Sequence, residues 1–267
     1  MTIETINVGA AEIAYELSGP VGAPVVLLSH CFCADHAFWN CHLKACSGFQ
    51  ILRYDTRGHG QSSRPPGPYT LDQLAGDVVA LLDGLKIQKV HFAGVSMGGM
   101  IGQTLALSYP ERLASLALVN TTPQYSDAQR VAWRERATVA LEQGMEAIHE
   151  GLMNRWFTDE AIATGNAGYK YMVEAVSRFS PQSFDAVTAA MCQLDTTERL
   201  RYISAPTLVV GAPEDPGVPP ELTKMLATEI PDAELHWLTP ARHLATLEHT
   251  TTFNELLSSH LARNASN

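Results

Sequence analysis

The chain has 267 residues, of which 46% are hydrophobic and 17% charged, and its formal net charge is −10. This length and composition indicate a well-buried globular protein rather than a disordered one. The negative charge and the absence of clustered Lys and Arg argue against a nucleic-acid or anionic-membrane partner. No apolar run approaches the roughly 20 residues of a membrane span, and residues 1–16 lack the layout of a signal peptide, so we expect a soluble cytoplasmic protein. These features leave the oligomeric state open.

The first predicted elements form one edge and part of the centre of a sheet. Weak alternation over Ile3–Leu17, broken at Gly9, predicts an antiparallel hairpin at the edge. The continuous apolar run Pro24–Ser29 predicts a strand buried on both faces, and Phe49–Asp55 predicts a further strand. These runs place the start of the hydrophobic core in the first 55 residues.

A segment rich in Cys and His lies between these two strands. A metal site is one interpretation, but the Cys and His spacing matches no zinc pattern. We expect instead reduced thiols packed around a loop, and we predict neither a metal nor a cofactor. The residues concerned are Cys31, Cys33, Cys41, Cys46, His30, His36 and His42.

A loop dense in Gly and Pro follows the second strand and leads into a helix. Asp55 and His59 are alternative catalytic candidates there, but an Asp at a strand end commonly caps a turn, so we expect Asp55 to hold Arg57 or loop amides. Apolar residues at helical spacing predict a helix over Leu71–Leu85, opened by a capping box of Thr70 with Gln73.

The next stretch has the G-x-S-x-G pattern of a nucleophile at a tight turn. A buried strand over Val90–Val95 ends in Ser96, and a glycine-rich apolar helix starts near Met97. Small neighbours let chain and substrate approach Ser96, and the helix N-terminus favours developing negative charge. A further buried strand over Arg112–Asn120 completes a strand–helix repeat, which predicts a parallel sheet.

The pattern changes after this strand. We predict a helical cap insertion over 121–200, and an α/β core formed by 1–120 and 201–267. The sheet resumes with strands over Pro206–Gly211 and Ala233–Leu238. The remaining predicted helices are 128–142, 145–154, 160–164, 168–179 and 183–195 in the cap, with 220–229 and 252–261 in the core.

Ser96, Asp215 and His243 form the candidate catalytic triad. Each lies in a loop after a predicted parallel strand, and such loops gather along one edge of a sheet. Asn120 stands at a similar strand end, but an amide cannot stabilise an imidazolium as a carboxylate does. The other late histidines lie inside a strand or at the final helix, namely His236, His249 and His260.

These residue types predict acyl transfer. His243 takes the Ser96 proton, the alkoxide attacks an acyl carbon, and Asp215 holds the imidazole tautomer. The backbone N–H groups of Met97 and Phe32 are the expected oxyanion donors. A serine rather than an aspartate at the turn argues against haloalkane dehalogenation and epoxide hydrolysis.

The motifs resemble those of a known superfamily over nearly the whole chain. Leu52–Leu74, His91–Gln103, Trp133, Arg155–Phe157 and the acid and histidine loops are similar to the α/β-hydrolases, and among them to the 3-oxoadipate enol-lactonases of aromatic degradation. The resemblance implies a mostly parallel eight-stranded sheet flanked by helices, with a helical cap. It also implies opening of a small carboxylated enol-lactone.

Cap residues are expected to recognise the substrate carboxylate. Trp133 and Arg136 lie three residues apart on a predicted helix and share a face, so Arg136 is placed to pair with a carboxylate beside Trp133. Trp156 is the third expected substrate-binding residue by the resemblance. A solvent-facing Arg136 and a packing Trp133 are the alternative. Residues 29–33 and 190–193 depart from the family pattern near the pocket, which favours another lactone or a less charged ester.

Three functional hypotheses follow. The first is a cofactor-free serine hydrolase whose partner is a small-molecule ester or lactone. The second keeps the triad for C–C bond hydrolysis of a ring-cleavage product or for haloperoxidase-type perhydrolysis. The third is a non-catalytic ligand-binding homologue, which the presence of all three triad residue types disfavours.

Overall fold

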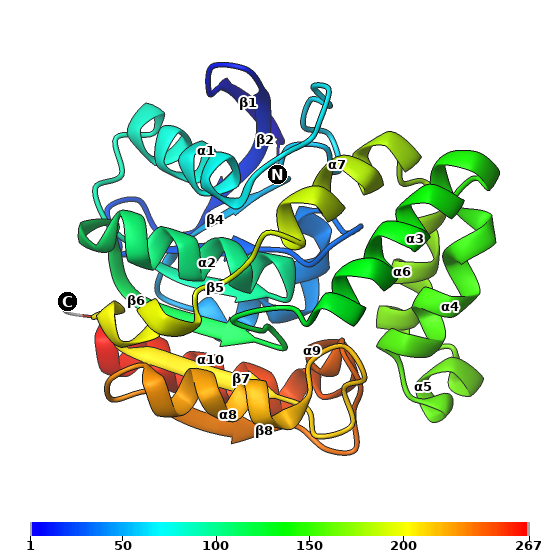
Figure 1. Ribbon diagram of the computed structural model, residues 1–267. Coiled ribbons are helices and arrows are strands. Elements are labelled where there is room, and N and C mark those ends of the chain that lie inside the picture. The colour runs from blue at the N-terminus through cyan, green and yellow to red at the C-terminus, as the bar shows by residue number, and fades with distance from the viewer. Residues whose placement is uncertain (1, 266–267) are drawn as a thin grey trace.

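The computed structural model describes residues 2–265 and contains an eight-stranded sheet in the order β1-β2-β4-β3-β5-β6-β7-β8 (Figure 1). The pairs β1–β2 and β2–β4 are antiparallel, and all other neighbours are parallel. The predicted fold class is therefore confirmed. The strands are β1 Glu4–Asn7, β2 Glu12–Ser18, β3 Val25–Ser29, β4 Gln50–Tyr54, β5 Val90–Val95, β6 Leu113–Val119, β7 Thr207–Gly211 and β8 Glu234–Trp237.

The buried strands follow from their continuous apolar sequences. Every residue of β3, β5, β6 and β7 is buried, as expected for parallel strands covered on both faces. The outer strands β1 and β8 are mostly exposed or half-buried, because each has only one neighbour in the sheet. The strand β5 lies between β3 and β6, so the turn after it opens near the middle of the sheet.

The helices of the core follow or connect its strands along the chain and pack against the sheet. The capping box predicted at Thr70 and Gln73 is present at the start of α1, and α2 follows β5 directly. The core helices are α1 Leu71–Gly84, α2 Met97–Ser108, α8 Pro220–Glu229, α9 Ala245–Glu248 and α10 Thr250–Asn264, with short 3₁₀ segments at Pro110–Arg112 (η2) and Thr197–Tyr202 (η3).

Five helices between β6 and β7 gather at one side of the sheet (Figure 1). We call these the cap helices: α3 Asp127–Gln143, α4 Glu146–Trp156, α5 Asp159–Thr164, α6 Ala167–Ser177 and α7 Pro181–Met191. The predicted helical pattern is confirmed, although α7 ends four residues before Asp195. Among the described residues, extended pairing in this stretch is limited to one bridge between Gln124 and Asp195. The division into a core and a cap insertion at 121 and 200 stays a prediction.

The Cys- and His-rich segment differs from the expected loop. It contains a 3₁₀ helix, η1 His36–Cys46, whose N-cap Asp35 accepts a hydrogen bond from the Ala37 N–H. Its histidines have separate partners, because His36 bonds to Asp55 and His42 to Asn254. All five cysteines of the chain are free thiols, and all but Cys41 are buried.

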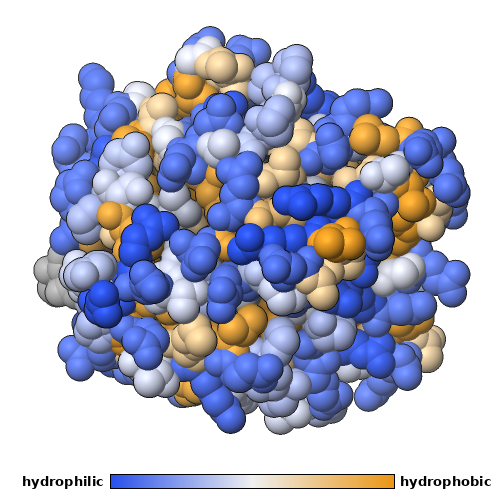
Figure 2. All heavy atoms as spheres, in the orientation of Figure 1, coloured by the Kyte–Doolittle hydropathy of each residue, from blue (hydrophilic) through white to orange (hydrophobic). Residues whose placement is uncertain are grey.

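The molecular surface shown in Figure 2 is mostly hydrophilic, with hydrophobic residues scattered singly or in small groups. Within residues 2–265, no helix combines the length and the apolar character that crossing a bilayer requires.

Candidate active site

Ser96 occupies a strained turn between β5 and α2. Its φ of 54° and ψ of −112° lie in a region that residues with a side chain rarely adopt. Two flanking glycines make this turn possible. A Cβ at Gly94 would lie 2.3 Å from the Gly98 backbone, and a Cβ at Gly98 would lie 2.3 Å from the Ser29 carbonyl oxygen. Only glycine at both positions lets β3, β5 and α2 approach this closely.

The structure brings the three predicted triad residues together. The Ser96 Oγ lies 2.8 Å from the His243 Nε2, and the His243 Nδ1 lies 2.7 Å from the Asp215 Oδ2. The three residues are 6%, 9% and 4% exposed, respectively. A hydroxyl, an imidazole and a carboxylate therefore form one continuous hydrogen-bonded chain that is largely shielded from water.

The Asp215 carboxylate is held by backbone and side-chain donors. Its Oδ1 accepts hydrogen bonds from the N–H groups of Gly217, at 2.7 Å, and Val218, at 3.1 Å. Its Oδ2 accepts from His243 and, at 3.4 Å, from the Asn120 Nδ2. These donors fix the plane of the carboxylate and its orientation towards His243.

Asn120 is thus a neighbour of the acid, a contact that we did not anticipate from the sequence. Its position at the end of β6, beside β7, was the available signal, because Asp215 follows β7. Asn120 also has a positive φ of 44°, and its Oδ1 lacks a hydrogen-bond partner within the described residues.

A small pocket opens at Ser96, and Trp133 and Trp156 are among its lining residues. Their role in binding substrate stays a prediction. The pocket volume is about 10 Å³, which is room for about one water molecule. Leu244 is a lining residue that sequence reasoning missed, whereas Met191 belongs to the segment 190–193 that was expected near the pocket. The full lining is Cys31, Phe32, Ser96, Trp133, Trp156, Met191, His243 and Leu244.

The two residues expected to donate to the oxyanion lie after the end of β3 and at the start of α2. Phe32 follows β3 and lines the pocket together with Ser96. Met97 is the first residue of α2, where backbone N–H groups lack intrahelical acceptors. The assignment of these two N–H groups as oxyanion donors stays a prediction.

An aromatic cluster closes the pocket between the core and the cap helices. The Phe32 ring lies 5.9 Å from the Trp133 ring, 5.7 Å from the Phe179 ring and 4.6 Å from the Phe184 ring, measured between centroids. Phe32 belongs to the core, whereas the other three come from the cap helices or the segment joining α6 to α7.

Arg136 lies beside the pocket wall rather than in its lining. Its guanidinium carbon is 5.1 Å from the centroid of the Trp133 ring, which confirms that the two residues share a face of α3. Burial lowers the pKa of Arg136, and the positive charge of Arg155 lowers it further. Within residues 2–265 neither arginine forms a salt bridge, and Arg155 donates instead to the Pro216 carbonyl oxygen at 2.6 Å.

Arg155 is a second cation near the triad that the sequence did not single out by itself. A Cβ at Gly217 would lie 3.7 Å from the Arg155 Nε and 3.5 Å from the His243 Nδ1. Two guanidinium groups that form no salt bridge within residues 2–265 therefore lie close to the candidate site.

Asp55 and His59 form contacts with residues of the neighbouring loops. The Asp55 carboxylate accepts the N–H groups of His36 and Gln61, both at 2.7 Å, so its expected contact with loop amides is confirmed. Arg57 pairs with Asp77 at 2.5 Å instead of with Asp55. His59 is buried against His30, and this burial lowers the pKa of His59 well below its usual value.

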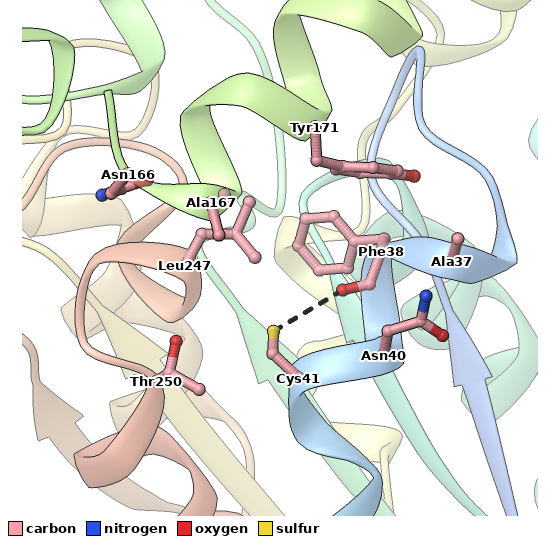
Figure 3. A pocket seen from close by; sticks show the side chains of 10 residues that line it. Ala37, Phe38, Asn40, Cys41, Asn166, Ala167, Tyr171, Leu247 and Thr250 are labelled. Atoms are coloured by element: carbon pink, nitrogen blue, oxygen red, sulfur yellow. Dashed lines mark hydrogen bonds between the residues drawn. The ribbon is translucent and has the colours of Figure 1, made fainter. Parts of the chain in front are cut away.

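A second cavity, of about 250 Å³, lies between η1, α6 and the start of α10 (Figure 3). Phe38 and Cys41 of η1 face Asn166 and Tyr171 across it, and Leu247 closes one side. None of the residues that line the Ser96 pocket lines this cavity.

Comparison with curated proteins places the chain among hydrolases. The model of the α/β hydrolase fold family matches residues 24–250. The 3-oxoadipate enol-lactonase 2 of Acinetobacter baylyi is 31% identical over 261 residues, which cover 97% of this chain and 97% of that protein. A putative carbamate hydrolase, RutD, of Azorhizobium caulinodans is 31% identical over 252 residues, 93% of this chain and 94% of that protein.

Solved structures agree with this placement. The enol-lactonase from Burkholderia xenovorans superposes with a TM-score of 0.93 at 31% identity, covering 97% of this chain and 100% of that chain. A hydrolase from Pseudomonas aeruginosa superposes with a TM-score of 0.92 at 32% identity, covering 97% and 98%. The resemblance stated from the motifs is confirmed. The chain therefore belongs to the α/β-hydrolase fold family and is a hydrolase enzyme.

Proposed function

We propose that the protein hydrolyses a small lactone or carboxylic ester through an acyl-enzyme on Ser96. The observation that supports this proposal is the continuous hydrogen-bonded chain from Ser96 through His243 to Asp215, with distances of 2.8 and 2.7 Å. A serine is a weak nucleophile by itself, and a base within hydrogen-bonding distance activates it.

The reaction runs in two halves. In the first, the His243 Nε2 takes the Ser96 proton while Oγ attacks the acyl carbon, and the N–H groups of Met97 and Phe32 stabilise the oxyanion. The tetrahedral intermediate collapses, the C–O bond of the ester breaks, and the His243 imidazolium protonates the leaving oxygen. In the second half, His243 takes a proton from water, which attacks the acyl-enzyme, and Ser96 regains its proton. Asp215 holds the imidazole tautomer and stabilises the imidazolium throughout.

The substrate in this proposal carries a carboxylate. Arg136 and Arg155 lie near the pocket without an acidic partner in the described part of the chain, and a carboxylate-bearing substrate would supply one. One relative at 31% identity is named a 3-oxoadipate enol-lactonase, a name that identifies such a substrate, and one solved structure at 31% identity is named an enol-lactonase. We therefore propose a small carboxylated enol-lactone as the substrate.

Two departures from the lactonase pattern fall on the pocket itself. Cys31 and Met191 both line it, and each belongs to a segment in which this chain differs from the expected family sequence. A related lactone or a less charged ester is therefore the alternative substrate, and a substrate panel decides between them.

The test is steady-state hydrolysis of 3-oxoadipate enol-lactone beside a neutral short-chain aryl ester, with Ser96→Ala as the control for each substrate. We expect strong preference for the lactone and loss of both activities in the variant. Turnover of the aryl ester alone would leave the serine mechanism and remove the substrate assignment. Full activity of Ser96→Ala would contradict the mechanism.

The same panel tests the remaining reactions. It includes a simple carbamate, because one relative is named a putative carbamate hydrolase. It also includes a vinylogous diketone for C–C bond hydrolysis and a peroxide-dependent halogenation assay. Activity confined to either of the last two would replace the lactonase proposal.

A further inference from the structure

The loop that carries His243 is tied to the cap helices on both sides of the histidine. On one side, the Leu244 N–H donates a hydrogen bond of 3.0 Å to the Trp156 carbonyl oxygen. Trp156 is the last residue of α4. We call residues 154–158, which include this helix end, the α4 clasp.

On the other side of the histidine, the Arg242 side chain reaches the same clasp. Its Nη1 donates to the carbonyl oxygens of Asn154, at 2.9 Å, and Phe157, at 2.8 Å. A guanidinium at this point also meets the negative end of the α4 dipole. The third contact of Nη1, with the Asp159 carboxylate at 3.0 Å, involves a side chain that is 90% exposed, and such ion pairs contribute little.

Glu248 completes the connection between the histidine loop and the clasp. Its Oε1 accepts the Arg242 N–H at 3.0 Å, and its Oε2 accepts the Thr158 N–H at 3.0 Å and the Thr158 hydroxyl. One carboxylate therefore bridges the residue before His243 and the last residue of the clasp.

The acid loop is tied to the cap helices in the same manner. The Arg155 Nη2 donates to the Pro216 carbonyl oxygen at 2.6 Å, and the Gln129 Nε2 donates to the Gly217 carbonyl oxygen at 3.1 Å. The N–H of that same Gly217 holds the Asp215 carboxylate. Cap side chains thus fix the peptide groups that in turn fix the acid.

From these contacts we infer that the α4 clasp aligns His243 and Asp215 with Ser96, and that Arg242 and Glu248 are positioning residues for the hydrolysis proposed above. The inference rests on that proposed function. Ser96 is fixed by the sheet and α2, whereas the loops of its two partners receive their alignment from the clasp. Displacing a catalytic group by about 1 Å can cost about 100-fold in rate, so contacts that never touch substrate control turnover.

The experiment compares Arg242→Ala with Asp159→Ala, a matched control that removes the exposed ion pair and leaves both clasp carbonyl contacts. Arg263→Ala is the second control, because it removes an arginine of α10 from a surface contact with Glu234 of β8. For each variant we would measure kcat and KM with the neutral aryl ester, the rate of Ser96 labelling by a fluorophosphonate, and thermal unfolding.

We expect Arg242→Ala to lower kcat and the labelling rate about 10- to 100-fold with KM within about twofold of the original protein. Arg242→Lys should recover part of the loss, because the ammonium keeps the charge and the donors but its shorter side chain reaches the two clasp carbonyls less well. Asp159→Ala and Arg263→Ala should keep kcat, KM and the labelling rate within about twofold of the original protein. A folded Arg242→Ala protein with unchanged kcat and labelling would overturn the inference.

Glu248→Gln covers the case in which Arg242→Ala fails to fold. It keeps the shape of the side chain but replaces one acceptor oxygen with a donor, and it should lower kcat and labelling while the protein stays folded. Unchanged values for both Glu248→Gln and Arg242→Lys would equally overturn the inference. Absence of labelling in the unaltered protein would instead contradict the proposed function, so the two failures are distinguishable.

Discussion

Ser96, the proposed nucleophile, shows how neighbouring residues hold a strained backbone in place. Its positive φ is maintained by backbone contacts, since its N–H donates to the Val119 carbonyl at 2.8 Å and its carbonyl accepts the Thr121 hydroxyl at 2.8 Å. The strain is therefore balanced by the sheet and the turn around it, which keep the hydroxyl clear of the backbone.

The close approach at Gly98 predicts a stability effect. Gly98→Ala would place a Cβ 2.3 Å from the Ser29 carbonyl oxygen, which is backbone and must shift, so we expect a loss of about 1–3 kcal/mol. The free energy of unfolding from urea denaturation measures it. Gly76→Ala in α1 is the matched control, because a Cβ there meets no atom within 4 Å and should be neutral or stabilising. Equal effects of the two variants would contradict the steric argument.

The proposed triad predicts that substitution of its residues causes large losses of turnover without loss of folding. Ser96→Ala and His243→Ala should lower kcat/KM by several orders of magnitude, and Asp215→Asn by about 10⁴-fold, because the amide favours the wrong imidazole tautomer. Circular dichroism checks that each variant is folded. Retained activity in any folded triad variant would remove that residue from the mechanism.

The position of Arg136 predicts that its substitution changes KM for one class of substrate more than for another. If it pairs with a substrate carboxylate, Arg136→Ala should raise KM for a carboxylated lactone about 10- to 100-fold and leave a neutral aryl ester nearly unchanged, since hydrogen bonds to charged groups contribute about 1.5–3 kcal/mol. Arg134→Ala, on the exposed face of the same helix, is the control. An equal effect of Arg136→Ala on both substrates would exclude Arg136 as the carboxylate anchor.

At the scale of elements, the local residue pattern predicted the strands whose formation depends on that pattern. The apolar runs identified β3, β5, β6 and β7 to within one or two residues, because strands buried on both faces need continuous apolar side chains. By contrast, η1 has no clear periodicity, and its start depends on the Asp35 N-cap. A single capping residue is a weak signal within a segment rich in Cys and His.

The candidate site was predictable in part for the same reason. Ser96, Asp215 and His243 each follow a recognisable strand, so their positions on the sheet edge could be inferred. The contacts of Arg242 and Glu248 could not, because their partners on the α4 clasp lie between 85 and 90 positions away in the chain. No rule of sequence spacing links the end of a cap helix to a loop that follows the last strand of the sheet.

At the scale of the whole molecule, buried histidines link stability to pH. Burial lowers the pKa of both His42 and His260 from 6.5 to about 4. Above pH 6.5 both are neutral in the folded and unfolded chains, and their contribution is fully present. As the pH falls from 6.5 towards 4, the unfolded chain takes up protons first, so stability is lost. His36, whose pKa is raised through its hydrogen bond with Asp55, acts in the opposite direction and stabilises at low pH.

We therefore expect the free energy of unfolding to decrease between pH 7.5 and 5, at about 1.4 kcal/mol per pH unit for each buried histidine that titrates only when unfolded. His42→Gln keeps a donor for Asn254 and should make this decrease shallower. His236→Gln, which alters a half-exposed histidine at the sheet edge, is the control. Urea unfolding at several pH values measures the slopes. Parallel curves for His42→Gln and the original protein would contradict the expectation.

The small volume of the pocket at Ser96 implies that part of the molecule moves when substrate enters. With about 10 Å³ the pocket has no room for a lactone, so substrate entry requires the cap helices or the aromatic cluster around Phe32 to move. The α4 clasp joins the cap to both triad loops by polar contacts, whereas Phe32 meets Trp133, Phe179 and Phe184 by apolar ring contacts. We therefore expect opening at the aromatic side to leave the proposed triad aligned.

Cys41 offers a way to watch such motion. It is the one exposed thiol of the five, and it lies across the 250 Å³ cavity from Asn166 and Tyr171 of α6 (Figure 3). Because burial of its surroundings raises the pKa of Cys41, coupling of a maleimide dye proceeds best at mildly alkaline pH. We therefore expect the unaltered chain to take one fluorophore between η1 and α6, and a change in its emission during turnover would report motion there without any engineered cysteine.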